Sequence, residues 1–108
     1  MTRKPVVPRV RALRDADEAI DYYLRKAGEK VAIGFVGALE RAYRRISLYP
    51  GSGSPRYAHE LDLPGLRCWA LKRFPYLVFY VEQEDHVDVW RILHGERNIP
   101  AWLRAETR

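Results

Sequence analysis

The densest hydrophobic pattern in the chain runs from Leu66 to Asn98, where large β-branched and aromatic residues are concentrated. Such residues favour a half-buried pleated surface. The pattern predicts three consecutive strands at Leu66–Lys72, Tyr76–Val81 and Val87–His94. Pro75 falls in the first connection, where its missing N–H does little harm. We therefore expect an antiparallel meander with short turns in the second half of the chain.

Alternation of side chains along the last strand places one cation among apolar residues. The residues that alternation assigns to that face are Val87, Val89, Arg91 and Leu93. A cation in such surroundings requires a partner, because burying a lone charge is expensive. We expect Arg91 either to pair with Glu60, Asp62 or Asp88, or to contact a bound anion on the sheet.

The first part of the chain predicts an edge strand followed by a helix. The segment Lys4–Leu13 alternates weakly, and its two prolines restrict it to a sheet edge. Asp15 and Glu18 have the spacing of a capping box, which predicts that the helix begins at Asp15. Gly28 is the expected stop. Between them runs an apolar stripe of helical period: Ala16, Ala19, Ile20, Tyr23, Leu24 and Ala27.

A second helix is predicted from about Glu29 to Leu48, and the short link makes the two helices an antiparallel hairpin. Its apolar stripe contains Ala32, Phe35, Val36, Leu39, Tyr43 and Ile46. A basic patch near its end is interpreted as a solvated face; it consists of Arg41, Arg44 and Arg45. We expect Pro50–Pro55 to be a loop, Arg56–Gly65 to be irregular and Pro100 to open a last helical turn.

These elements predict an α+β fold with the order β-α-α-β-β-β and a short C-terminal helical turn. The helical hairpin is expected to pack on one face of a mainly antiparallel sheet. The other face is expected to stay partly open and to carry the function. A chain of 108 residues suits a single domain over 1–108.

The composition indicates which kinds of partner the protein binds and in which cellular compartment we expect it. The formal net charge of +5 favours acidic partners, either nucleic acid or an acidic protein segment. There is neither a secretory signal nor an apolar run near the roughly 20 residues that span a bilayer, so we expect no membrane contact. The single cysteine, Cys68, cannot form an internal disulfide, which favours a reducing cytoplasm.

The chain carries no motif for a metal or a cofactor. The three histidines, His59, His86 and His94, are not spaced like metal ligands. Neither a phosphate-binding loop nor a dinucleotide fingerprint is present. We therefore expect no metal and no cofactor.

Three runs in the meander resemble the RelE/ParE toxin superfamily of bacterial type II toxin–antitoxin (plasmid stabilisation) systems. They are GLR at Gly65–Arg67, FPYLVFY at Phe74–Tyr80 and VWRILHGERNIP at Val89–Pro100. The expected order of elements also matches over nearly the whole chain. The resemblance implies a cognate antitoxin that wraps the toxin with an extended, often acidic segment. It also implies that the toxin reaches operon DNA only indirectly, through that antitoxin.

The superfamily contains two functional classes. Members of the ParE branch inhibit DNA gyrase and are not enzymes, whereas RelE-like members are ribonucleases that cut messenger RNA on the ribosome. The ribonucleases commonly place an arginine where this chain has Tyr76, and the strand LRCWALK is aromatic and apolar where they carry several cations. A phosphodiester transition state needs cations aimed at its developing charge. We therefore expect a ParE-like gyrase inhibitor, with a RelE-like nuclease as the alternative.

Each alternative has its own expected site. For a nuclease, His94 would act as acid or base. Arg73, Arg91 and Arg97 would then surround the phosphate. The residues expected to bind the target are Arg67, Trp69, Arg91, His94 and Arg97.

The antitoxin is expected on an apolar surface of the helical hairpin that a small sheet would not cover. Its residues are Tyr22, Tyr23, Leu24, Phe35 and Leu39. A strand or amphipathic helix from an acidic peptide would satisfy both this surface and the net charge.

Overall fold

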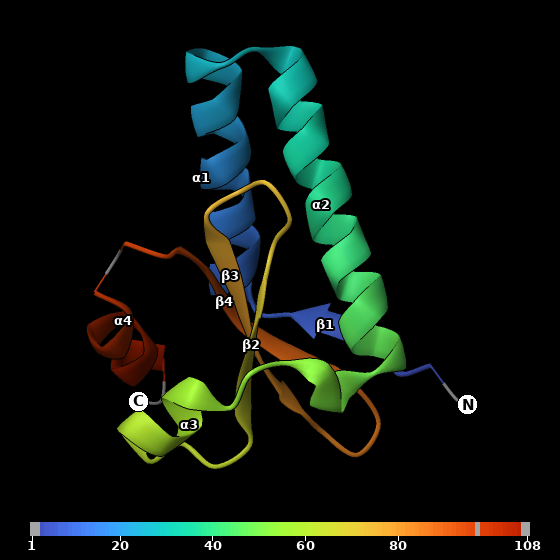
Figure 1. The fold of residues 1–108 in the computed structure, drawn as a ribbon, viewed down its shortest axis with the longest axis vertical. Helices are drawn as coiled ribbons and strands as arrows, with labels where there is room; N and C mark the ends of the chain where they lie inside the picture. The colour runs from blue at the N-terminus through green and yellow to red at the C-terminus, as the bar shows by residue number, and fades with distance from the viewer. Residues whose placement is uncertain (1–2, 97, 107–108) are drawn as a thin grey trace.

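A four-stranded sheet with the strand order β1-β4-β3-β2 forms the centre of the molecule. A computed structural model describes residues 3–96 and 98–106 of the chain (Figure 1). The elements are β1 (Val6–Pro8), α1 (Val10–Lys26), α2 (Glu29–Leu48), η1 (Pro50–Ser52), α3 (Arg56–Leu61), β2 (Leu66–Ala70), β3 (Tyr76–Glu82), β4 (Val87–His94) and α4 (Ile99–Glu106). Strand β1 runs parallel to β4, and the other pairs are antiparallel. The predicted α+β fold is confirmed.

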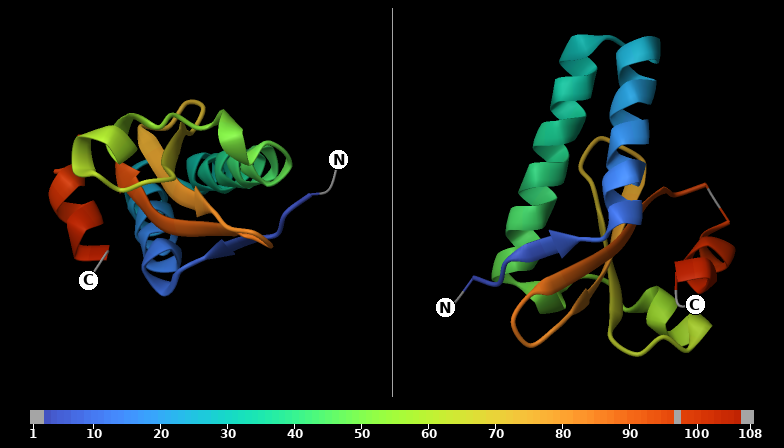
Figure 2. Two further views of the ribbon diagram at one scale, coloured as in Figure 1. Left: turned by 90° about the horizontal axis from the view of Figure 1, so that it is seen from below. Right: turned by 180° about the vertical axis from the view of Figure 1, so that it is seen from behind.

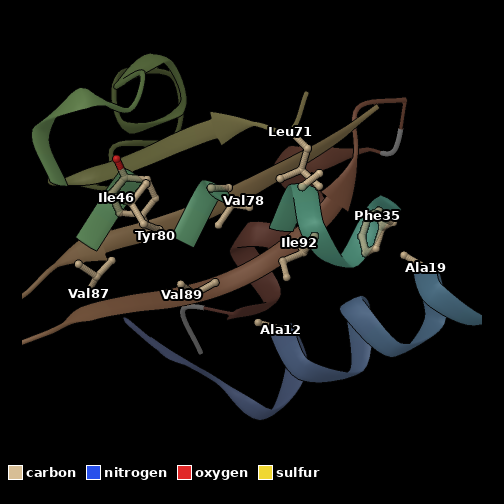
Figure 3. Close-up of a cluster of buried hydrophobic side chains, with 12 residues drawn as sticks. Ala12, Ala19, Phe35, Ile46, Leu71, Val78, Tyr80, Val87, Val89 and Ile92 are labelled. Carbon is tan, nitrogen blue, oxygen red and sulfur yellow. The ribbon is translucent and has the colours of Figure 1, made fainter. Parts of the chain in front are cut away.

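The helical hairpin of α1 and α2 packs on one face of the sheet and encloses the larger core (Figures 1 and 3). Phe35 and Ile46 of α2 are fully buried there, against Val78 and Tyr80 of β3. Small residues on α1, such as Ala12, allow the helix to approach the sheet closely. The predicted hairpin is therefore confirmed, and most of its two apolar stripes pack on the sheet, whereas Leu24 and Ala27 at the end of the α1 stripe are exposed.

Helix α1 begins at Val10, earlier than the capping-box pattern predicted. The backbone N–H of Leu13 donates to the carbonyl oxygen of Arg9, so the helical ladder is already established ahead of Asp15. Asp15 is buried inside the helix and does not cap it. The predicted strand over Lys4–Leu13 is correspondingly reduced to Val6–Pro8. The predicted start was wrong because the Asp15/Glu18 spacing does not by itself distinguish a capping carboxylate from one that forms a tertiary ion pair.

The second face of the sheet is covered, which contradicts the expected open face. Helices α3 and α4 lie over it, as the view from below shows (Figure 2). Their core contains Leu66, Phe79, Leu93, Ile99 and Leu103, each at most 2% exposed. The segment predicted as irregular thus forms α3 at Arg56–Leu61. The physical reason is that β3 is apolar at successive positions, so both of its faces require burial.

A β-bulge in β4 changes which face of the sheet its side chains point to. Phe79 is opposite Arg91 while Tyr80 is opposite Val89, so Trp90 is the extra residue on β4. A bulge of this kind interrupts the alternation of side chains. Leu93 therefore belongs to the core under α3 and α4, whereas Val89 belongs to the core under the hairpin. The simple alternation predicted for this strand is wrong beyond the bulge.

The buried hydroxyl of Tyr80 holds the loop that follows α2. It donates to the carbonyl oxygen of Pro50 at 2.7 Å and accepts from the backbone N–H of Gly53 at 3.0 Å. Burial raises the pKa of Tyr80, so the phenol remains the neutral donor that this arrangement needs. A Cβ atom at Gly53 would overlap the Tyr80 hydroxyl oxygen and would lie 2.9 Å from Tyr80 Cζ.

The substitution Gly53→Ala is expected to lower the free energy of unfolding by about 1–3 kcal/mol, because it overpacks a buried site. Urea denaturation followed by circular dichroism measures the change. Gly51→Ala is the matched control, since nothing lies within 4 Å of its Cβ position. Equal stability of the two variants would show that the Tyr80 contact does not restrain the loop.

Candidate functional site

Arg91 and Asp15 form a buried ion pair where β4 extends beyond β1. The Arg91 Nε and Nη2 atoms donate to the two carboxylate oxygens of Asp15 at 2.7 and 2.8 Å. The same carboxylate accepts the backbone N–H of Ile92 at 2.9 Å. Strand β1 pairs with β4 only at Val87–Val89. Beyond that pairing, the Asp15 carboxylate provides the hydrogen-bond acceptor for the backbone N–H of Ile92.

The partner of Arg91 differs from the sequence prediction. A buried, paired cation was expected, and the Arg91 side chain is 2% exposed. Its partner is Asp15 on α1, whereas Glu60, Asp62 and Asp88 were the expected candidates. The Trp102 ring of α4 also lies 4.7 Å from the guanidinium carbon. Arg91 is therefore held between the helical layers and is not presented to solvent.

His94, the predicted acid or base, lines an open groove of about 720 Å³ between α1 and the end of β4. The charged residues that line this groove beside His94 are Asp15, Glu18, Asp21, Arg25 and Glu96. Its one arginine, Arg25, pairs with Asp21 at 3.1 Å. Within the part of the chain that the structure describes, the groove around His94 is thus predominantly anionic.

His94 makes two local contacts, one through a ring nitrogen and one through its ring. His94 Nδ1 accepts the backbone N–H of Glu96 at 3.1 Å, and its ring packs edge-on against Tyr76 at 5.2 Å. Burial, followed by the neighbouring Tyr76 and Tyr22, raises the pKa of Tyr23 in the same groove. The Tyr23 phenol is therefore neutral at physiological pH and is a poor general base there.

The remaining residues of the predicted nuclease and target sites are distributed over separate places. Arg73 is exposed in the β2–β3 turn, where it adopts a positive φ of 69°. Arg67 donates to the carbonyl oxygen of Gly53 at 2.8 Å and thereby holds the loop after α2 against β2. Trp69 lies beside α2, with the Arg45 guanidinium 5.6 Å from its ring. Arg97 lies outside the described residues.

The predicted antitoxin surface is only partly accessible. Tyr22 and Leu24 are 48% and 47% exposed, respectively. Tyr23 and Leu39 are half-buried, while Phe35 is fully buried. Phe35 packs within a cluster of aromatic rings made by Tyr23, Phe74 and Tyr76. Phe35 therefore supports this surface from beneath.

A second groove, which the sequence reasoning missed, lies between α2 and the edge strand β2. It has a volume of about 410 Å³ and is lined by Ala38, Arg41, Ala42, Arg45, Trp69, Ala70, Leu71 and Lys72. The cations here come from α2 and from the turn that follows β2, which are distant in sequence. Arg41 and Arg45 belong to the basic patch that was interpreted as a solvated face, and their i, i+4 spacing, which Ala38 and Ala42 share, was the sequence signal of this groove.

The described residues contain no cluster of His, Cys, Asp and Glu that could hold a metal ion. None of the helices in the described ranges is sufficiently long and apolar to cross a membrane.

Comparison with known proteins assigns the family. The model of the ParE toxin of type II toxin-antitoxin system, parDE, matches residues 6–99. Toxin ParE3 of Caulobacter vibrioides is 33% identical over 94 residues, which cover 86% of this chain and 88% of that protein. A chain of the chromosomal ParDE TA system from P. aeruginosa shares the fold, with a TM-score of 0.73, 21% identity and coverage of 87% of this chain and 98% of that chain. This chain therefore belongs to the ParE toxin family of type II toxin–antitoxin systems.

Proposed function

We propose that this ParE-family toxin inhibits DNA gyrase and is neutralised by a cognate antitoxin. Membership of the family supports the proposal, since the family model covers residues 6–99. The observation that separates it from the RelE-like alternative is the anionic character of the groove that contains His94.

Ribonucleolytic cleavage would require cations around His94. Phosphate contacts by Lys and Arg dominate the affinity of proteins for nucleic acid. At His94 an RNA phosphate would instead meet the carboxylates of Glu18 and Glu96, while Arg25 is already paired with Asp21. The Arg91 guanidinium is buried against Asp15 and faces away from solvent. This arrangement favours a protein target over a phosphodiester substrate.

The His94→Ala variant tests the proposal in cells. Induction of the wild-type toxin is expected to arrest chromosome replication and to trigger a DNA-damage response while transcripts remain intact. His94→Ala is expected to remain toxic and to leave transcripts intact, because a gyrase inhibitor needs no acid or base at this position even if His94 contacts the target. The measurements are colony formation after induction and transcript integrity by northern blot. Rapid transcript cleavage that disappears in His94→Ala would support the RelE-like nuclease instead.

The antitoxin part of the proposal has a separate readout. Co-expression of the product of the adjacent reading frame is expected to restore colony formation and to form a stable complex with the purified toxin. Continued killing in the presence of that product, with no complex, would refute the predicted neutralisation.

A further inference from the structure

Strand β4 has an open backbone edge where it extends beyond β1. The N–H of Ile92 points away from β3, because the Asp15 carboxylate accepts it at 2.9 Å. Residues two apart on a strand direct their backbone groups to the same side, so the N–H and C=O of His94 also point away from β3. The N–H of Gly95, one residue further, donates to the carbonyl oxygen of Pro75 on the β3 side at 2.9 Å, as this alternation requires. No hydrogen bond joins the backbone groups of His94 to another residue that the structure describes, so the edge is open there.

This open edge lies in the groove of about 720 Å³ between α1 and the end of β4. The carboxylates of Glu18 and Glu96 line the groove, are exposed and form no ion pair with a described residue. The rings of Tyr22 and Tyr76 line it as well, and the face of an aromatic ring attracts a cation within about 6 Å. The groove therefore combines groups that bind Lys or Arg side chains with an edge that can bind a peptide main chain.

We infer that an extended segment of gyrase that carries Lys or Arg binds in this groove and adds a strand to β4 at His94. Its cationic side chains pair with Glu18 and Glu96 and lie over the rings of Tyr22 and Tyr76. The main-chain hydrogen bonds at the edge supply affinity, and the flanking charges supply specificity. The inference rests on the proposed function, because the occupant is a segment of the proposed target.

Other occupants are disfavoured by the charge of the groove. The phosphates of a nucleic acid and the carboxylates of an acidic antitoxin segment would both lie beside Glu18 and Glu96, and such like-charge contacts cost several kcal/mol. A metal ion is also disfavoured, since the described residues form no cluster that could hold one. The open edge and the unpaired carboxylates together favour a basic peptide.

The test measures binding of the purified full-length toxin to the gyrase holoenzyme by surface plasmon resonance. Glu18 and Glu96 are exposed, so Glu18→Lys/Glu96→Lys is expected to fold normally, which thermal unfolding checks. This double variant is expected to bind gyrase at least about tenfold more weakly, because it places cations opposite the cations of the occupant. The matched control is Glu40→Lys/Glu84→Lys, which makes the same change in net charge at exposed positions outside the groove. Its affinity is expected to stay within about twofold of the wild type, because single exposed ion pairs contribute little.

Amide hydrogen exchange tests the strand addition without any substitution. In the complex of the wild-type toxin with gyrase, the His94 amide is expected to exchange at least about tenfold more slowly than in the free toxin, because it gains a hydrogen bond. Normal gyrase affinity in Glu18→Lys/Glu96→Lys, or an unchanged His94 amide in the complex, would overturn this inference and leave the proposed function standing. Failure of the wild-type toxin to bind gyrase would overturn both. Loss of antitoxin binding in Glu18→Lys/Glu96→Lys, with gyrase binding intact, would identify the antitoxin as the occupant and refute the inference.

Discussion

Replacement of Asp15 by alanine is expected to lower the free energy of unfolding by about 3–5 kcal/mol, because it removes one partner of a buried ion pair. The Arg91 side chain is 2% exposed and that of Asp15 is 9% exposed, so the pair is largely shielded from water and loss of the carboxylate leaves a buried cation without this partner. The backbone N–H of Ile92 loses its acceptor in the same change. Urea denaturation measures the effect, which is a large fraction of the roughly 5–15 kcal/mol that stabilises a domain.

The control for Asp15 is another aspartate of α1. Asp21 pairs with Arg25, but both side chains are about two-thirds exposed, at 66% and 64%. Asp21→Ala is therefore expected to change stability by less than about 1 kcal/mol. Asp15→Ala/Arg91→Met is expected to recover part of the loss, since an apolar pair of similar volume tolerates burial. If Asp15→Ala were no more destabilising than Asp21→Ala, the pair would have no structural role.

Replacement of Phe79 by alanine is expected to lower the free energy of unfolding by about 3–5 kcal/mol, because it empties a packed aromatic position. Phe79 is fully buried under α3 and α4, with the Tyr57 ring 5.4 Å away in an edge-on contact. Thermal and urea denaturation measure the loss. Leu13→Ala is the control, since Leu13 is 51% exposed on a helix and is expected to change stability by less than about 0.5 kcal/mol.

The Phe79 result tests directly whether the second face is covered. Similar stabilities for Phe79→Ala and Leu13→Ala would mean that α3 and α4 do not pack on the sheet in solution. The larger loss for Phe79→Ala would confirm that the sheet is buried on both sides.

The fold could be predicted because its signals are local. The strands of the meander and the stripe around Phe35 follow from the period of apolar positions. The start of α1 could not be predicted, because Asp15 resembles a cap in sequence and is used in a tertiary ion pair. The covering of the second face was missed because α3, at Arg56–Leu61, is short and lacks a clear periodic pattern. The bulge at Trp90 depends on pairing with β3, which no local pattern encodes.

The site was harder to predict because its charge comes from distant segments. The groove at His94 combines Glu18 and Asp21 of α1 with Glu96, which follows β4. Its negative character therefore appears only after folding, in a chain whose formal net charge is +5. The basic groove at Lys72 likewise needs α2 to lie beside β2. Family resemblance indicated the general class, and the anionic lining of the His94 groove supports the proposed gyrase inhibition over the RelE-like alternative.

The most direct measurement is ATP-dependent supercoiling of a relaxed plasmid by purified gyrase in the presence of the purified toxin. The account predicts that both the wild-type and the His94→Ala proteins inhibit supercoiling, and that an excess of antitoxin relieves the inhibition. In parallel, messenger RNA on purified ribosomes is expected to remain intact. Unimpaired supercoiling at a molar excess of toxin, together with cleavage of the ribosome-bound transcript, would contradict the account.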